Sequence, residues 1–171
     1  MPHSRSLLRV ARRLVSDGAA AEDLVQETLL RAWRSFDQFQ TGTNARAWLF
    51  RIMFNAFYAQ GRQARSAPVV VSLDAPGHTA EPARPATLSL IDAAEVNRAF
   101  GELSEEHRAV LLLGVVEGFT CQEMADVLAL PMGTVMSRLS RGRQALRERL
   151  ANGSAKVYRS HAVAGSTHKE A

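Results

Sequence analysis

The sequence has a single cysteine, very little lysine and no long apolar run. Cys121 alone excludes an intramolecular disulfide and a cysteine-rich zinc site. No apolar stretch is long enough to span a membrane and no signal peptide is visible, so we expect a cytoplasmic protein without membrane insertion. Only Lys156 and Lys169 are lysines, which leaves arginine as nearly all of the 21 basic residues.

Sequence features of catalysis are also missing. We find no glycine-rich phosphate loop, no nucleophile elbow and no His, Cys or Glu spacing that suits a metal. The five histidines are scattered, and the acidic pair Glu105 and Glu106 lies at a predicted helix start, where capping explains it. We therefore expect a protein that is not an enzyme and uses no metal and no cofactor.

The charge of the chain favours a polyanionic partner. The net charge is +4 and the sequence pI is about 10.0. Residues 66–95 differ from the rest, with one arginine, four acids and several prolines. We expect an all-α protein with two small helical domains at residues 1–65 and 90–150, a flexible acidic linker at 66–89 and a disordered tail at 151–171.

Periodicity predicts three helices in the first domain, at about residues 6–15, 20–36 and 45–62. The helix at 45–62 has a good N-cap in Thr43 or Asn44. In the helix at 20–36, helical spacing predicts a buried stripe of Val25, Leu29, Ala32, Trp33 and Phe36. The opposite face of that helix is expected to be exposed, with Asp23, Gln26, Glu27, Leu30 and Arg34.

Aromatic residues are concentrated in this domain. Eight of the eleven fall between positions 33 and 58, interleaved with arginines. We expect core positions for Trp33, Phe36, Trp48 and Ile52. One three-helix core hardly has room for every ring, and exposed rings beside arginines suit stacking on unpaired bases. For Phe39 and Phe57, core packing and base stacking are equally open.

Residues 120–150 indicate a helix-turn-helix. Thr120 and Glu123 fit a capping box, and Pro131 with Gly133 interrupts the helical pattern. The second helix is predicted to bury an apolar stripe: Val135, Leu139, Ala145, Leu146 and Leu150. Its other face is predicted to carry five arginines: Arg138, Arg141, Arg143, Arg147 and Arg149. Such a helix fits the DNA major groove, although a helical hairpin with a solvated basic face is the alternative.

Two further helices are predicted ahead of the helix-turn-helix. Apolar spacing indicates one helix from about Leu90 to Leu103. Ser104 with the acids after it suits the start of another, which runs on through apolar positions until Gly118 ends it.

Four motifs follow one another along the chain. They are AEDLVQETLLRAWR at 21–34, NARAWLFRIMFN at 44–55, LSEEHRAVLLL at 103–113 and GTVMSRLSRGR at 133–143. In this order they resemble a bacterial RNA polymerase sigma factor of the extracytoplasmic-function (ECF) group, over residues 7–150. The resemblance implies a three-helix sigma-2 domain at 1–65 and a sigma-4 domain at 90–150. One departure is the first helix, which looks clipped compared with the family.

The resemblance also implies roles for single residues. The helix at 21–34 would dock on the clamp coiled coil of the polymerase β′ subunit, with contacts from Asp23, Gln26, Glu27 and Arg34. The segment 39–62 would recognise and melt the minus-ten promoter element. Asn55 would read a flipped-out base there, with further contacts from Phe39, Asn44, Arg51 and Phe54. The helix-turn-helix would read the minus-thirty-five element through Thr134, Ser137, Arg138, Arg141 and Arg143.

The implied partners are core RNA polymerase, through its β′ clamp and β flap, and promoter DNA as duplex and as melted strand. The family also implies an anti-sigma factor that controls a stress or envelope response. An ordinary transcriptional regulator is the alternative, but it assigns no function to the aromatic segment or to the helix at 21–34, which resembles a clamp-binding helix. A module that binds acidic proteins does not explain the two-domain layout. Whether the two domains pack together in the free protein is open from sequence.

Overall fold

The computed structural model describes residues 3–15, 17–66 and 93–164 of the 171-residue chain. Every regular element within these ranges is a helix, which confirms the predicted all-α class. The predicted linker at 66–89 lies outside the described residues, apart from Ser66, which ends a helix. No helix in the described part of the chain has the length and apolar character needed to cross a lipid bilayer.

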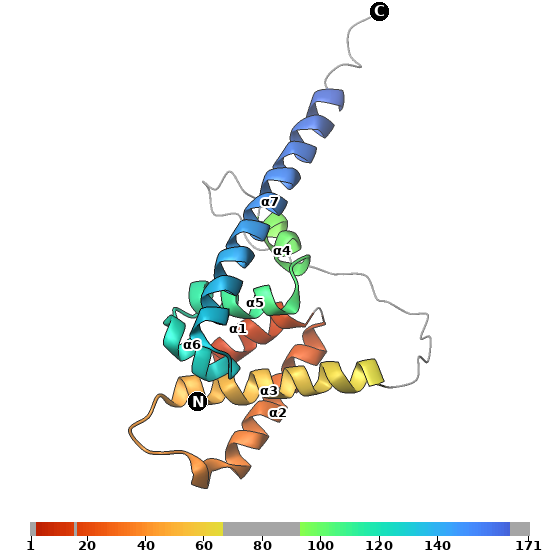
Figure 1. Ribbon diagram of the computed structural model, residues 1–171. Coiled ribbons are helices and arrows are strands. Elements are labelled where there is room, and N and C mark those ends of the chain that lie inside the picture. Colours follow the sequence, from red (N-terminus) through yellow and green to blue (C-terminus); the bar gives the residue numbers. More distant parts are fainter. Residues whose placement is uncertain (1–2, 16, 67–92, 165–171) are drawn as a thin grey trace, which may run out of the picture.

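The N-terminal domain contains three α-helices and one short 3-10 turn. They are α1 (Ser4–Leu14), α2 (Gly18–Arg34), η1 (Phe36–Gln38) and α3 (Ala45–Ser66). Asp17 caps α2, since its carboxylate accepts from the backbone N–H groups of Ala19 and Ala20 at 3.4 and 3.1 Å. Asn44 caps α3, as predicted, because its Oδ1 accepts from the N–H of Ala47 at 3.1 Å. Helix α2 packs against both α1 and α3 (Figure 1).

The prediction of Trp33 and Phe36 as core residues was wrong. Their side chains are 79% and 61% exposed. The reason is tertiary: α1 has only 11 residues, and the C-terminal end of α2 projects away from it (Figure 1). Val25 and Ala32 of the same stripe are buried, whereas Leu29 is half-buried. The core is formed instead by Leu7, Val10, Leu24, Phe50, Met53 and Phe54, with Trp48, Ile52, Phe39 and Phe57 half-buried around it.

The C-terminal domain contains four α-helices and one π-helical turn. They are α4 (Ala93–Gly101), α5 (Glu105–Leu111), the π-helical η2 (Leu112–Val116), α6 (Cys121–Leu128) and α7 (Met132–Ala164). Ser104 caps α5 by accepting from the N–H of His107 at 3.4 Å. The sequence predicts a single helix from Ser104 to Gly118. In the structure this helix changes to π-helical geometry at Leu112, and it ends at Gly118, whose φ is 71°.

The predicted disorder from residue 151 onwards was wrong for the first part of the tail. Helix α7 has 33 residues and continues to Ala164, and it projects from the body of the molecule as a single rod (Figure 1). Elongating an existing helix adds one hydrogen bond per residue, and no proline interrupts residues 151–164. Residues 165–171 lie outside the described residues.

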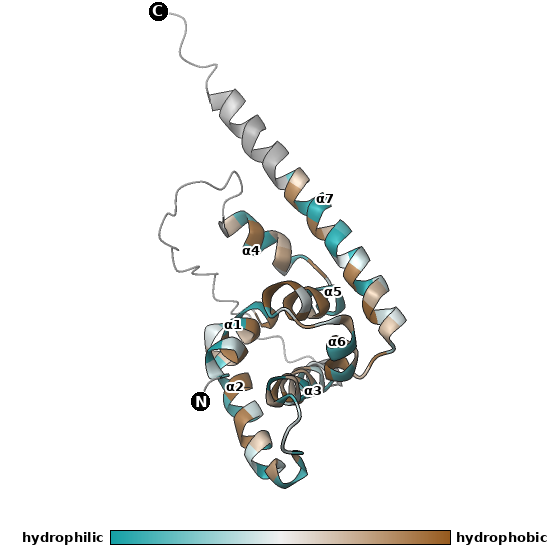
Figure 2. Cartoon of the chain, turned by 90° about the vertical axis from the view of Figure 1, so that its left-hand side faces the viewer, coloured by the Kyte–Doolittle hydropathy of each residue, from teal (hydrophilic) through white to brown (hydrophobic). Residues whose placement is uncertain are grey.

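The two domains pack against each other. Their buried side chains form one continuous apolar cluster, which runs from Leu7 in α1 to Leu139 in α7. Helix α6 lies on α3, and α5 lies beside α1 (Figures 1 and 2). The question that the sequence left open is therefore answered: the two domains pack together in the free chain.

Candidate nucleic-acid interface

The helix-turn-helix begins with the predicted capping box. The hydroxyl of Thr120 accepts from the backbone N–H of Glu123 at 3.2 Å, and the N–H of Thr120 donates to the Glu123 carboxylate at 2.8 Å. This backbone hydrogen bond, followed by one from the Thr120 hydroxyl, lowers the pKa of Glu123 below the ordinary glutamate value. The start of α6 is therefore held by an ionised carboxylate at neutral pH.

The turn between α6 and α7 contains Pro131, where the sequence predicts an interruption. Ala129 ends α6 in the left-handed conformation with φ 52°. Pro131 directly precedes the first residue of α7, and its carbonyl accepts from the N–H groups of Thr134 and Val135 at 2.9 and 3.1 Å. Val135 and Leu139 then bury their side chains, together with Met124 and Val127 of α6. This packing fixes which face of α7 is turned outward.

The five arginines of α7 do not form one exposed face. Arg141, Arg143 and Arg147 are exposed. Arg138 is paired with Glu106 of α5 at 3.1 Å and its side chain is only 24% exposed, while Arg149 lies 3.8 Å from Glu102. The prediction of a continuous basic face was therefore too broad.

Helical spacing sorts the predicted minus-thirty-five residues into groups. Thr134, Ser137, Arg138 and Arg141 follow the spacing i, i+3, i+4 and i+7, so they share one face of α7. Thr134 and Ser137 are half-buried, and the Ser137 hydroxyl donates to the Thr134 carbonyl at 3.0 Å. Arg143 is two positions from Arg141 and lies on the other flank. Helix α7 thus brings four of the five residues together on one face.

A buried glycine in α7 was missed by the sequence analysis. Gly142 is buried, and a methyl group added to it would lie 3.3 Å from His107 Cβ and from Leu111 Cδ1. Its lack of a side chain lets α7 approach α5 closely. The spacing from Val135 and Leu139 by seven and three positions was the available signal.

The predicted polymerase-binding residues lie on the outward face of α2. Asp23, Gln26 and Arg34 are exposed, as is Leu30. Glu27 is half-buried and paired with Arg31 on the same helix at 2.6 Å. The outward orientation expected for this face is therefore confirmed.

An open apolar pocket of about 390 Å³ lies at the C-terminal end of α2. It is lined by His3, Leu29, Ala32, Trp33, Phe36, Phe39, Ala45, Trp48 and Leu49. The ring of Phe39 lies between Phe36 and Trp48, with centroids 6.1 and 5.0 Å away. The aromatic rings that the sequence assigned to the core thus form the wall of a surface pocket.

The predicted minus-ten residues of α3 and its cap differ in burial and in contacts. Arg51 and Asn55 are exposed and four positions apart, so they lie on one helical face. Phe54 has no exposed surface. It therefore belongs to the core, on the face that α3 shares with Phe50, and the prediction that it contacts DNA is not supported in this structure. Asn44, the cap of α3, donates through Nδ2 to the Glu123 carboxylate at 2.9 Å.

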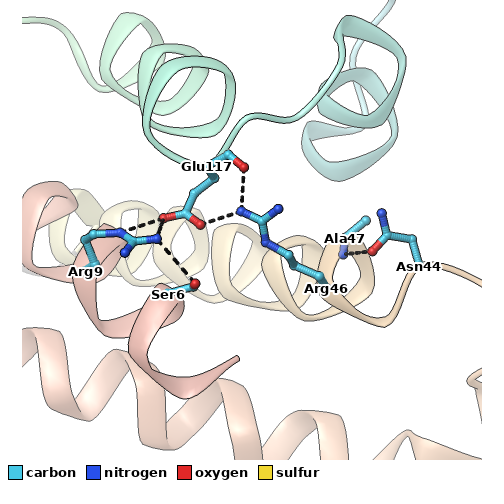
Figure 3. Close-up of polar contacts among 6 residues, drawn as sticks. All are labelled: Ser6, Arg9, Asn44, Arg46, Ala47 and Glu117. Carbon is cyan, nitrogen blue, oxygen red and sulfur yellow. Dashed lines mark hydrogen bonds and ion pairs between the residues drawn. The ribbon is translucent and has the colours of Figure 1, made fainter. Parts of the chain in front are cut away.

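An acidic residue that the sequence analysis did not single out lies between the two domains (Figure 3). The side chain of Glu117 has no exposure, and it accepts from Arg9 Nη2 at 2.7 Å and from Arg46 Nη2 at 2.5 Å. Arg46 also donates to the Glu117 backbone carbonyl at 2.6 Å. The only local signal was an acid directly after the apolar run at 109–116.

Arg46 also lies against aromatic rings of both domains. Its guanidinium carbon is 4.5 Å from the ring centre of Phe119 and 5.8 Å from that of Phe50. Further along α3, burial raises the pKa of Tyr58, against a smaller opposing effect of Arg138. In residues 3–15, 17–66 and 93–164, no three His, Cys, Asp or Glu side chains gather closely enough to hold a metal ion.

Both domains match known protein families. Residues 1–67 match Sigma-70 region 2, and residues 93–146 match Sigma-70, region 4. These matched ranges correspond to the N-terminal and C-terminal domains of the structure. They also agree with the order of motifs along the chain.

Curated relatives match across both domains. The ECF RNA polymerase sigma factor SigL of Mycobacterium tuberculosis is 39% identical over 146 residues, which are 85% of this chain and 82% of SigL. The ECF RNA polymerase sigma factor EcfG of Rhodopseudomonas palustris is 35% identical over 143 residues, covering 82% of this chain and 77% of EcfG.

Solved structures show the same fold. The sigma factor RpoE in complex with the anti-sigma factor NepR, from Bartonella quintana, matches with a TM-score of 0.68 and 34% identity, over 86% of this chain and 91% of that one. CnrH in complex with the cytosolic domain of CnrY matches with a TM-score of 0.60 and 26% identity, over 88% and 84%. The motifs, the two-domain fold and these relatives lead to one conclusion: the chain belongs to the ECF RNA polymerase sigma factors.

Proposed function

We propose that this chain binds core RNA polymerase and uses its two domains to read the two elements of a promoter. The observation that carries the proposal is the pairing of a region 2 domain with a region 4 domain in one chain. Sigma factors are specificity factors of transcription initiation, so the chain is not an enzyme. We place its action in the cytoplasm, where core polymerase works.

The face of α2 that carries Asp23, Gln26, Glu27 and Arg34 is the proposed dock for the β′ clamp. Three of these four side chains are exposed, and Glu27 is half-buried. Leu30 and Trp33 add apolar surface to the same helix, with 51% and 79% exposure. Exposed apolar side chains rimmed by polar ones are typical of a protein-binding surface.

Helix α3 is the proposed reader of the melted minus-ten element. Asn55 carries an amide that can both donate to and accept from a base edge, and it is exposed. Arg51, one turn earlier on the same face, is exposed and is proposed to hold the phosphate backbone. The rings of Phe39 and its neighbours offer stacking surfaces at the start of the helix. Asn44 is proposed as a further contact once its bond to Glu123 is released.

Helix α7 is the proposed reader of the minus-thirty-five element in the major groove. One face presents Thr134, Ser137, Arg138 and Arg141, and Arg143 is exposed on another side of the helix. Arginine can bind the O6 and N7 atoms of guanine in a bidentate manner. We assign Arg141 the role of base reader because it is exposed, whereas Arg138 is paired with Glu106. The exposed apolar residues Met132 and Met136 of α7 are compatible with a contact to the β flap.

An anti-sigma factor is the proposed regulator of this chain, in a stress or envelope response. Two of the solved relatives are complexes of a sigma factor with NepR and of CnrH with the cytosolic domain of CnrY. The apolar pocket at the end of α2 is an exposed surface that a partner helix can cover.

Transcription with purified core polymerase tests the proposed function. Fragments of the source genome are transcribed by core polymerase with and without the chain, and the start sites are mapped. We expect new start sites that share two sequence elements. Specific duplex binding by the chain alone, without any polymerase-dependent start site, would instead identify an ordinary transcriptional regulator.

A further inference from the structure

The interface between the two domains carries an inference about regulation. Its centre is the carboxylate of Glu117, whose side chain has no solvent exposure. Oxygen Oε1 accepts from Nη2 and Nε of Arg9 at 2.7 and 3.0 Å, and Oε2 accepts from Arg46 at 2.5 Å (Figure 3). Both arginines belong to the N-terminal domain. A residue of one domain is thus neutralised by two residues of the other.

This arrangement is stable only while the domains are together. A buried carboxylate is strongly unfavourable unless it is paired and hydrogen-bonded. When the domains separate, Glu117 and both arginines regain water, which offsets much of the lost ion pairing. Arg9 and Arg46 already retain 49% and 31% exposure in the packed state. An interface of this kind can hold the chain closed and still come apart.

Two further polar contacts lie in the same interface. Arg108 of α5 donates to the carbonyl of Leu14 at the end of α1 at 3.0 Å. Asn44 donates to the Glu123 carboxylate, which also forms the capping box of the helix-turn-helix. The Asn44 side chain, which is proposed to contact the minus-ten element, is therefore hydrogen-bonded to the domain that is proposed to read the minus-thirty-five element.

The packed state cannot contact both promoter elements at once. Elements named minus ten and minus thirty-five are centred about 25 base pairs apart, which is roughly 85 Å of B-form DNA at about 3.4 Å per base pair. In the structure, Nδ2 of Asn44 in the N-terminal domain lies 2.9 Å from the carboxylate of Glu123 in the C-terminal domain. The chain between the domains, residues 67–92, can cover at most roughly 90 Å at about 3.5 Å per residue. The two domains must therefore separate to contact both elements, and residues 67–92 are long enough to allow it.

We infer that the interface around Glu117 is an autoinhibitory latch: it holds the free chain closed and opens before both promoter elements are engaged. The closed state itself stands on the contacts above, whereas its inhibitory effect rests on the proposed function. Because only the open fraction can bind both elements, the apparent affinity is reduced by that fraction. Weakening the latch is therefore expected to make the chain more active, which loss of a merely structural contact would not do.

The first arm of the test measures closure without any polymerase. Fluorophores are placed on Gln60→Cys in α3 and Gln144→Cys in α7, both exposed positions, in a chain with Cys121→Ser. Energy transfer is compared between this chain and the same chain carrying Glu117→Gln. We expect high transfer in the parent chain and a shift of the closed-to-open ratio by about tenfold or more in the variant.

Matched controls separate the latch from general effects of charge. Glu102→Gln also removes a carboxylate that faces two arginines, Arg98 and Arg149, but all three residues belong to the C-terminal domain. It should leave energy transfer unchanged. Arg9→Ala, at an exposed site of α1, removes one of the two partners of Glu117. It replaces Glu117→Gln in the test if that variant misfolds. Its control is Arg12→Ala, whose partner Glu22 lies in the same domain.

The second arm measures transcription by core polymerase at increasing concentrations of each variant. We expect Glu117→Gln and Arg9→Ala to reach half-maximal transcription at a concentration several-fold lower than the parent, with both controls unchanged. Low transfer in the parent chain, or equal transfer in Glu117→Gln and Glu102→Gln, would overturn the latch. Opening without any gain in transcription would overturn its inhibitory effect. If closure depends on Glu117 but no variant supports transcription, the closed state is supported, and both the proposed function and the inhibitory effect are refuted.

Discussion

The ring of Phe119 stands edge-on to the ring of Phe50, with the centroids 5.3 Å apart and the planes at 80°. Phe119 precedes the helix-turn-helix, and Phe50 lies in the first half of α3 in the other domain. Both are almost completely buried. The segment that leads into the helix-turn-helix is thus anchored against the core of the N-terminal domain, beside the ion pairs of Glu117.

Truncation of this ring should destabilise the packed chain. We expect Phe119→Ala to lower the free energy of unfolding by about 3–5 kcal/mol, the usual range for a buried phenylalanine. Phe36→Ala removes the same atoms from a ring that is 61% exposed and should cost less than about 1 kcal/mol. Urea denaturation followed by circular dichroism measures both. Equal losses for the two variants would contradict the assigned burial.

The start of α6 should weaken in acid. The pKa of Glu123 is lowered by the hydrogen bond from the Thr120 backbone, so its contribution to stability is complete above about pH 4.5, the ordinary value, and is lost as the pH falls through the lowered pKa. A titration of the Glu123 side-chain carbon by NMR should show the low midpoint. In Thr120→Ala, the hydroxyl hydrogen bond is absent and the midpoint should move upward. No difference between the two proteins would contradict a role for that hydroxyl.

Two glycines of α7 should respond in opposite ways to a larger side chain. An atom added at Gly133 meets nothing within 4 Å, so Gly133→Ala should stabilise the chain by about 0.5–1 kcal/mol through helix propensity. At Gly142, His107 and Leu111 leave no room, and Gly142→Val should destabilise it by about 1–3 kcal/mol through overpacking. Thermal unfolding of the two variants checks the signs. Stabilisation by Gly142→Val would show that α5 and α7 are less closely packed.

Arg141 should contribute to the choice of promoter. If it forks onto a base of the upstream element, Arg141→Ala should cost about 1–3 kcal/mol of binding there and relax the preference at one base pair. Arg98→Ala, in α4, removes an arginine paired with Glu102 and should leave promoter preference unchanged. Binding of the polymerase complex to promoter variants, over a range of salt concentrations, provides the measurement. An unchanged preference together with an unchanged salt slope would place Arg141 off the DNA.

Asn55 should be needed for promoter opening and not for binding to polymerase. Loss of its contacts to an unpaired base should slow open-complex formation by an amount equivalent to about 1–3 kcal/mol. Gln26→Ala, on the outward face of α2, should show the reverse: weaker binding to core polymerase and a normal opening step once bound. Permanganate footprinting of thymines and a core-binding titration distinguish the two effects. Equal loss of core binding in both variants would refute the assignment of Asn55.

Local features were predicted well because they depend on few neighbours. The capping box of Thr120 and Glu123 and the cap of α3 by Asn44 each span only four residues. The outward face of α2 followed from helical spacing alone. The family resemblance supplied the two-domain order, which the matches at residues 1–67 and 93–146 then confirmed.

Burial of single rings was predicted less well because it depends on what covers a helix. Trp33 and Phe36 have the spacing of core residues, but α1 is too short to cover the end of α2. Phe54 was placed with the DNA contacts although it faces the core, and only its neighbour Asn55 is exposed. A one-residue step along a helix turns a side chain by about 100°, so a motif cannot show which of two neighbours is buried.

By itself, the sequence determined the helices, their caps and the order of the two domains, since these arise from contacts within a few residues or from motifs along the chain. The tertiary structure decided how the domains meet. Glu117 and Arg9 are 108 positions apart, and nothing local to either residue predicts their pairing. The reason is physical: a buried carboxylate requires partners that only chain folding can bring to it.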